Sequence, residues 1–301
     1  MGIMEFSQNE AKHLYVGISL KILHSFIFTI MSVLLVQYSQ SLPIIQVLFC
    51  RVFIGALFSF FILKLLKRPI PLRMTKKSVM LYLLRALISF IAMGIWVVSL
   101  KNVGINESVA LGYITPVWLI LIAVLFFKEK LTLQHVVVIS LNIFAAMLIL
   151  QPKFSTVDGL SLIAGLGSGL LWSIYNSICK KQAETEHYVL QCFYTFVFSV
   201  ILMLPFAIYL WEPIILEQFL GLSLIGCIGA FNVSVLFLAY SYAPLITLIP
   251  FDYLRLLFSM VLSYILFGAP LTFEFVIGAI IISTTDLYFY IMQRNKPLYS
   301  Y

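Results

Sequence analysis

The sequence predicts an all-α integral membrane protein of ten transmembrane helices in two inverted five-helix repeats. Three observations predict this fold. First, hydrophobic residues make up 62% of the 301 residues and charged residues only 10%, whereas about a quarter of the residues of a soluble protein are charged. Second, the apolar residues form ten runs of roughly twenty residues, the length with which a helix crosses a bilayer. Third, short segments of the first half of the chain recur in the second half.

The ten runs follow one another with only short connections, which leave no room for a soluble enzyme domain. Because a bilayer offers no water to unpaired amide groups, each run is expected to be helical. The first residues lack the basic start and cleavage site of a signal peptide, so the first run is expected to remain as an anchor. The expected spans are 15–36, 44–66, 78–100, 105–127, 134–151, 158–179, 188–211, 217–240, 245–267 and 271–293.

Basic residues at the ends of the runs predict the orientation of the chain in the membrane. With the N-terminus in the cytoplasm, thirteen Lys and Arg residues lie on the cytoplasmic side, counting Lys64 at the end of the second span, and only Lys101 and Lys153 lie in connections on the other. Such a bias is typical of cytoplasmic loops. We therefore expect both termini to be cytoplasmic. The net charge of +7 then reflects orientation, and no nucleic-acid partner is expected.

The two halves of the chain are related by an offset of 140 residues. FKEKLT at 127–132 aligns with FGAPLT at 267–272, and the same offset places Tyr113 on Tyr253. Residues 1–151 and 152–301 are therefore predicted to be two repeats. Each repeat has five spans, an odd number, so equivalent helices run in opposite directions. Inverted repeats of this kind are typical of secondary transporters, which bind their substrate near the midplane between the halves.

Four segments of the chain carry a likeness to a known family: YITPVWLILIAVLFFKEKLT at 113–132, PFDYLRLLFSMVLSYILFGAPLT at 250–272, CRVFIGA at 50–56 and YLLRALISFIAMGIWVVSL at 82–100. With these segments both halves resemble the EamA domain of the drug/metabolite transporter superfamily. The resemblance implies ten helices in two inverted repeats and transport of small metabolites across bacterial inner membranes. Glu129 matches the acidic residue of the family's first short loop, whereas Ala269 departs from it at the equivalent position. The surroundings of Arg85 are similar to S-adenosylmethionine uptake carriers of obligate intracellular bacteria.

Asp252 and Arg255 lie in the middle of the ninth apolar run. Ionised side chains are costly at membrane depth and usually face a protein interior or a watery cavity. A spacing of three puts both on one face of a helix, where they can pair with each other or with a ligand that carries both charges. Pro244 and Pro250 precede them and leave backbone carbonyls without their helical partners. The alternative is a structural ion pair that joins helices.

Basic residues outnumber acids inside the spans. Lys21, Arg51, Arg85 and Arg255 face only Asp252 and Asp286 as clearly internal acids, so a cavity lined by them favours a substrate carboxylate or phosphate. Two of these cations have an alternative. Lys21 could extend its flexible stem to the headgroups, and Arg85 could equally anchor its helix next to the basic loop.

The predicted substrate site combines charged and aromatic side chains. We expect Arg255 and Arg85 to engage a carboxylate, and Asp252 and Tyr253 to hold an amine, a sulfonium or a ring. Aromatic faces attract cations. His24 and Asp286 are the candidate groups for coupling to a proton; a hydrogen-bonded packing role for the histidine and an arginine partner for the aspartate are the alternatives. The full predicted substrate-binding set is Arg85, Tyr113, Trp172, Tyr175, Asp252, Tyr253 and Arg255.

These features predict a secondary active transporter that moves a small zwitterionic or amine-bearing metabolite by alternating access. S-adenosylmethionine and amino acids fit the description. The expected partners are the substrate, the lipid bilayer and a proton or a counter-substrate; no metal, cofactor or catalytic residue is expected, because the sequence has no nucleotide-binding loop or zinc motif. The alternatives are a membrane-embedded lipid or acyl transferase, which would place reactive groups near a headgroup plane, and a structural membrane protein.

Overall fold

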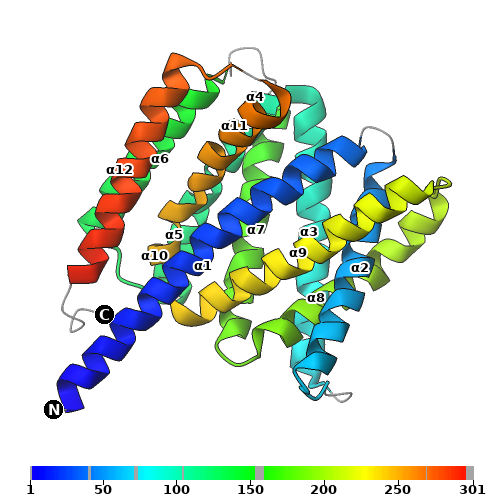
Figure 1. Ribbon diagram of the computed structural model, residues 1–301, viewed down its shortest axis with the longest axis horizontal. Coiled ribbons are helices and arrows are strands. Elements are labelled where there is room, and N and C mark those ends of the chain that lie inside the picture. The colour runs from blue at the N-terminus through cyan, green and yellow to red at the C-terminus, as the bar shows by residue number, and fades with distance from the viewer. Residues whose placement is uncertain are drawn as a thin grey trace.

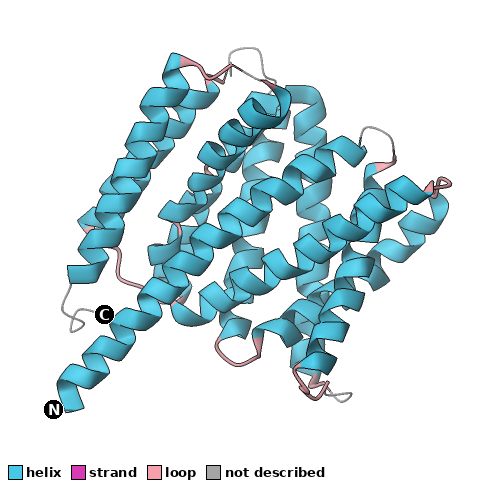
Figure 2. Cartoon of the chain, viewed as in Figure 1, coloured by secondary structure: helices cyan, strands magenta, loops and turns pink. Residues whose placement is uncertain are grey.

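The computed structural model describes residues 2–39, 42–70, 74–103, 105–152, 159–268 and 270–295. Throughout these residues the chain is helical with short connections (Figures 1 and 2). Ten segments are long and apolar enough to cross a membrane, which confirms the expected number of spans. The helices are α1 (Gly2–Ser39), α2 (Ile44–Leu65), α3 (Lys76–Val103), α4 (Ile105–Gly112), α5 (Thr115–Phe126), α6 (Leu133–Leu150), α7 (Gly159–Ala183), α8 (Tyr188–Tyr209), α9 (Leu216–Tyr242), α10 (Leu245–Leu248), the 3-10 turn η2 (Pro250–Asp252), α11 (Leu254–Phe267) and α12 (Phe273–Asn295).

The offset of 140 residues recurs in the helix boundaries. α3 and α9 begin 140 residues apart, and so do α6 and α12. Lys128, the second residue after the end of α5, has φ 54°, and its equivalent Gly268, which follows α11, has φ 64°. Left-handed residues of this kind end a helix. The repeat is therefore visible in the backbone itself, while the division at residues 151 and 152 remains a prediction because 153–158 lie outside the described residues.

The fourth and ninth spans are broken, and each was expected as a single run. α4 and α5 are separated at Tyr113, and the ninth span consists of α10, η2 and α11. Pro116 and Pro250 lie at these breaks. Proline has no N–H and its ring clashes with the preceding turn, so an α-helix cannot continue through it undisturbed. The breaks expose backbone carbonyls in the same relative place in both halves.

Side chains from neighbouring helices donate to backbone carbonyls beside the two breaks. The Ser25 hydroxyl of α1 donates to the Phe251 carbonyl at 3.0 Å. The Ser173 hydroxyl of α7 donates to the Thr115 carbonyl at 3.0 Å. Because no water is available in hydrocarbon, these bonds are what makes broken helices tolerable at membrane depth. The breaks are therefore held by the tertiary structure around them.

The broken helices pack against the longest helices of the bundle. α1 crosses the molecule diagonally and contacts α9 along its length and α11 near its middle (Figure 1). α3 packs on α7, α2 on α8 and α9, and α6 on α12. The break of the ninth span thus lies between α1 and α6, surrounded by protein.

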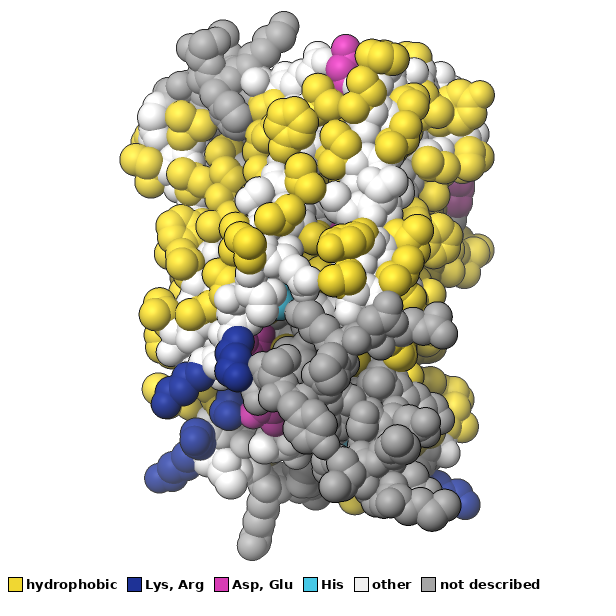
Figure 3. Space-filling model, turned by 90° about the vertical axis from the view of Figure 1, so that its left-hand side faces the viewer, with side chains coloured by type: hydrophobic (Ala, Val, Ile, Leu, Met, Phe, Trp, Pro, Cys, Tyr) yellow, Lys and Arg dark blue, Asp and Glu magenta, His cyan; other side chains and the backbone are white. Residues whose placement is uncertain are grey.

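Apolar and basic surfaces are separated along the molecule. Figure 3 shows hydrophobic side chains over most of one face and Lys and Arg side chains gathered toward its lower end. The end of the molecule at which the N-terminus lies also carries the connections 66–70 with 74–75, 127–132 and 184–187 (Figure 1). We call this the basic end. Its placement in the cytoplasm remains a prediction.

Candidate functional site

A cluster of four polar side chains occupies the break of the ninth span. Asp252 ends the η2 turn, and Arg255 follows one turn later in α11, so both point to the same side. Lys21 and His24 lie one turn apart on α1 and face them. We call these four residues the charge cluster. The i, i+3 spacing on each helix is what brings both pairs onto facing surfaces.

One carboxylate oxygen holds the charge cluster together. The Lys21 ammonium lies 2.8 Å from Asp252 Oδ1, and the Arg255 guanidinium lies 2.5 Å from the same atom. Arg255 Nη2 also lies 3.1 Å from His24 Nε2. The other ring nitrogen of His24 lies 3.3 Å from the Asn232 carbonyl of α9. Asp252 and Arg255 thus pair with each other, one of the two arrangements that their spacing allows.

Exposure differs across the cluster. The Lys21 side chain is 3% exposed, that of Asp252 18% and that of Arg255 28%. Lys21 is therefore turned inward to Asp252 and does not extend to the headgroups, because the carboxylate lies within hydrogen-bond distance. Asp252 and Arg255 retain accessible surface, so the cluster has a closed side and an open side.

Tyr113 and Tyr253 join the two broken helices. Their rings stack with centroids 5.4 Å apart, and the Tyr253 hydroxyl donates to the Tyr113 carbonyl at 3.0 Å. The repeat places them as equivalents, and the structure places them in contact. Tyr253 is 0% exposed. In this conformation it fastens one break to the other and offers no surface to a ligand.

Trp172 and Tyr175 line the neighbouring face of α7. Their rings meet edge to face at 5.4 Å. The next residue, Asn176, accepts a hydrogen bond from the Tyr240 hydroxyl at 3.1 Å, and the ring of Tyr240 lies 5.9 Å below the Lys21 ammonium. The predicted aromatic residues of α7 are thus linked to the charge cluster through α9.

Arg85 contacts Tyr175 and lies apart from the charge cluster. Its guanidinium carbon is 5.1 Å from the centre of the Tyr175 ring, and one nitrogen donates to the Gln182 side chain. Among the described residues no ion pair or hydrogen bond joins Arg85 to Asp252 or Arg255. Arg85 is fully buried, which shows that it lines the interior and does not anchor its helix at the surface.

Asp286 forms a separate polar site between α6 and α12. The Asn142 amide donates to Asp286 Oδ1 at 2.8 Å, and the Thr285 hydroxyl donates to the Asn142 oxygen at 2.7 Å. No arginine lies within ion-pair distance of Asp286 among the described residues, so the alternative of an arginine partner is wrong. The neutral side-chain amide of Asn142 is the partner of Asp286 instead.

Lys21 and Tyr240 belong to the site but were absent from the predicted set. The signal for Lys21 was its position three residues before His24, which puts both on one helix face. Tyr240 carried no positional signal, because aromatic residues recur throughout the apolar runs. Its contact with Asn176 arises only from the packing of α9 on α7.

Glu129 has a defined structural role at the basic end. Its carboxylate accepts the backbone N–H groups of Leu245 and Ile246 at 3.0 and 2.9 Å, which caps the start of α10. Lys180 donates to the Tyr240 carbonyl in the last turn of α9 at 2.6 Å and to the carbonyl of Ala243, the residue after that helix, at 3.0 Å. These two side chains hold the corner from which the ninth span enters the bundle. Ala269 lies outside the described residues.

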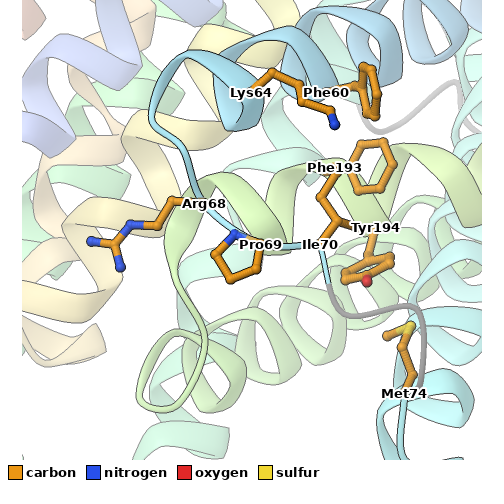
Figure 4. A pocket seen from close by; sticks show the side chains of 8 residues that line it. All are labelled: Phe60, Lys64, Arg68, Pro69, Ile70, Met74, Phe193 and Tyr194. Atoms are coloured by element: carbon orange, nitrogen blue, oxygen red, sulfur yellow. The ribbon is translucent and has the colours of Figure 1, made fainter.

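Two surface hollows among the described residues lie away from the charge cluster. One, of about 500 Å³, lies at the basic end between α2 and α8 (Figure 4). In that view Arg68 points away from the rings of Phe193 and Tyr194. The other lies between α6 and α12 beside Thr285. Among the described residues no three His, Cys, Asp or Glu side chains gather as metal ligands.

The fold and the site together define the class of protein. Ten apolar helices enclose a charged cluster, and one of the two spans that carry it, the ninth, is broken where its backbone faces other helices. This arrangement is that of a membrane transporter, and the chain is a multi-pass membrane protein. The EamA-like transporter family matches residues 15–151 and 159–285. The chain belongs to that family, and the two matches correspond to the two halves.

Relatives share the transporter class but differ in their cargo. The chain is 28% identical to a riboflavin transporter of Brucella anthropi, over 69% of this chain and 75% of that protein. It is 23% identical to an S-adenosylmethionine uptake transporter of Rickettsia bellii, over 72% and 74%. It is 22% identical to a pseudopaline exporter of Pseudomonas aeruginosa, over 75% and 78%. One solved crystal structure superposes with a TM-score of 0.76 at 14% identity, covering 94% of this chain and 98% of that one, and supports the fold.

Proposed function

We propose that the protein is a secondary carrier that moves a small zwitterionic or amine-bearing metabolite across the bacterial inner membrane by alternating access. Both termini are cytoplasmic in this proposal, and the substrate binds where the ninth span is broken. S-adenosylmethionine and amino acids are the substrate classes that fit the charges. The relative from Rickettsia bellii, an S-adenosylmethionine uptake transporter, supports the first of these.

The observation that carries the proposal is the sharing of one carboxylate by two cations. Asp252 Oδ1 holds both Lys21 and Arg255. A substrate ammonium or sulfonium can take the place of one cation at Asp252, and the displaced cation is then available for the carboxylate of the same substrate. The two ion pairs become three in this exchange, and no charged group is left without a partner. Binding therefore avoids the large cost of leaving a buried charge without a partner.

Aromatic side chains around the cluster already hold cations. The Arg255 guanidinium lies 4.4 Å from the centre of the Phe28 ring, and Lys21 lies over Tyr240. Faces that attract these side chains attract a substrate cation in the same way. Trp172 and Tyr175 extend the aromatic surface along α7. A planar ring in the substrate is suited to this surface, whereas Tyr113 and Tyr253 serve as the joint between the broken helices.

Coupling is assigned to His24 or Asp286. His24 lies within the charge cluster between Arg255 and the Asn232 carbonyl, so a proton taken up there would change the balance of charge around Asp252. Asp286 carries a carboxylate held by Asn142, from which a proton can be exchanged. The sequence contains no nucleotide-hydrolysing motif. We propose a proton gradient or substrate exchange as the energy source.

The test is uptake into proteoliposomes that contain the purified protein. Radiolabelled S-adenosylmethionine, amino acids and riboflavin are offered with and without a pH gradient, and with unlabelled compound preloaded inside. We expect saturable uptake of at least one zwitterion, stimulated by the gradient or by preloading. Chromatography of the vesicle contents shows whether the compound is intact. Absence of uptake of every zwitterion and amine, or recovery of a chemically altered product as a transferase would give, overturns the proposal.

A further inference from the structure

Glu129 ties the first half of the chain to the start of the ninth span. Its carboxylate accepts the N–H groups of Leu245 and Ile246, which belong to the second half. Its own backbone N–H donates to the Ala123 carbonyl at 3.2 Å, so Glu129 is fixed to the end of α5. Hydrogen bonds to a charged acceptor are about twice as strong as neutral ones. The contact therefore fastens the end of α5 to the beginning of α10.

The chain is closely packed around this contact at the basic end. α10 packs on α5 and on α1. The approach of α1 is so close that a Cβ at Gly17 would lie 2.7 Å from the side chain of Ala243, just before α10. From Leu245 to Ile249 every residue is at most 2% exposed. No open path therefore leads along α10 from the basic end to Asp252, although Asp252 itself retains accessible surface.

The repeat predicts where the equivalent contact would lie at the opposite end. With the offset of 140 residues, Glu129 corresponds to Ala269, and Leu245 corresponds to Ile105, the first residue of α4. An alanine side chain has no hydrogen-bond acceptor. The helices equivalent to α10 and α5 are α4 and α11, and among the described residues they show no packing comparable to that of α10 on α5. The two ends thus differ in residue type and in structure.

A bond present at one end only favours one conformation of the carrier. Inverted repeats let a carrier open a central site first to one side and then to the other, and a contact made in one conformation alone shifts the population toward it. Resting on the proposed transport function, we propose that Glu129 is a positioning residue that holds the basic end closed, while Ala269 leaves the opposite end without the matching bond. In the favoured conformation the charge cluster is reached from the opposite end. Opening of the basic end requires release of Glu129 from α10.

The alternative is a purely local role for Glu129. A carboxylate at the start of a helix is a cap, and its loss would loosen α10 without any effect at the opposite end. The two roles differ in what happens far from the substitution. A latch links the two ends, so that loosening one end tightens the other, whereas a cap does not.

Hydrogen–deuterium exchange of the purified full chain, followed by mass spectrometry, reports on both ends at once. Peptides over 243–252 cover the start of the ninth span, and peptides over 105–112 cover α4. We expect Glu129→Ala to speed exchange about tenfold or more in 243–252, as loss of hydrogen bonds to a charged group implies. Exchange in 105–112 should become slower, because the opposite end closes more often. Glu184→Ala, which removes an exposed carboxylate at the same end, should change neither region.

The converse variant places a carboxylate at the opposite end. Lys128 and Gly268 have φ 54° and 64°, so the backbone turns in the same way just before residues 129 and 269. Ala269→Glu should therefore slow exchange in 105–112 and speed it in 243–252, and Ala269→Gln should do so less, because a neutral acceptor is weaker. Together with Glu129→Ala, Ala269→Glu should shift both regions further than either change alone.

The response of the end remote from each substitution decides the proposal. It is overturned if Glu129→Ala alters 243–252 alone, which would make Glu129 a local cap, or if Ala269→Glu leaves both regions as in the wild type. If Glu129→Ala cannot be purified as folded protein, the result for Ala269→Glu decides. Exchange is measured without any substrate, so uptake by the wild type remains a separate test and leaves the transport function standing if the latch is refuted.

Discussion

Replacement of Lys21 and Asp252, singly and together, separates a binding role of the charge cluster from a structural one. Asp252→Asn leaves the Lys21 ammonium without a carboxylate in the interior. Arg255 loses the same partner but keeps His24 and the Phe28 ring and has accessible surface. The cost of Asp252→Asn therefore falls mainly on Lys21. The double variant Lys21→Met, Asp252→Asn removes both charges and leaves the net charge of the cluster as in the wild type.

The magnitude follows from the geometry. At 2.8 Å the attraction between the two charges is about 6 kcal/mol at an effective dielectric constant of about 20. Removing one partner of a buried pair costs about 3–5 kcal/mol, and the 18% exposure of Asp252 lets water screen part of it. We expect a loss of about 3 kcal/mol in the free energy of unfolding for Asp252→Asn, and recovery to within about 1 kcal/mol in the double variant, because apolar replacements of whole ion pairs are often neutral.

The assay pairs denaturant unfolding with uptake into proteoliposomes. A matched control is the exposed pair Lys181 and Glu184, which has the same 2.8 Å separation but side chains 70% and 38% exposed. Lys181→Met with Glu184→Gln should change stability by less than about 1 kcal/mol, since exposed pairs contribute little, and should leave uptake intact. The decisive measurement is uptake by the stable double variant of the buried pair. Uptake should be lost there, and uptake at the wild-type rate would refute the reasoning.

Three further predictions address packing, the joint between the breaks, and coupling. In Gly17→Ala the new Cβ would lie 2.7 Å from the Ala243 side chain, so the unfolding free energy should fall by about 1–3 kcal/mol, whereas Gly94→Ala, which meets no atom within 4 Å, should not lower it. Tyr253→Phe removes one hydrogen bond and keeps the ring stack, so stability should fall by about 1 kcal/mol and the maximal uptake rate should fall while the substrate KM is retained; a changed KM would contradict this role. If Asp286 carries the coupling proton, Asp286→Asn should abolish stimulation of uptake by a pH gradient while exchange with preloaded substrate continues, and unchanged stimulation would assign coupling elsewhere.

The sequence predicts most strongly where the physics is local or compositional. Helical spans follow from the need to pair backbone amides in hydrocarbon, and the ten spans are confirmed. Helical geometry also puts Asp252 and Arg255 on one face, where the structure shows them paired. Contacts between residues far apart in the sequence could not be predicted in this way. Lys21 pairs with Asp252, which lies near the other end of the sequence. Asp286 is bonded to Asn142 and not to an arginine. Neither contact has a local signal.

The sequence by itself determined the membrane class, the ten spans, the twofold repeat and the presence of costly charges in the ninth span. Only the tertiary structure decided which partners those charges have: that Lys21 turns inward, that Tyr113 and Tyr253 join the two breaks, and that Arg85 lies apart from Asp252. The physical reason is that periodicity along a helix defines its own faces. The rotation and depth at which one helix meets another depend on the packing of all of them together.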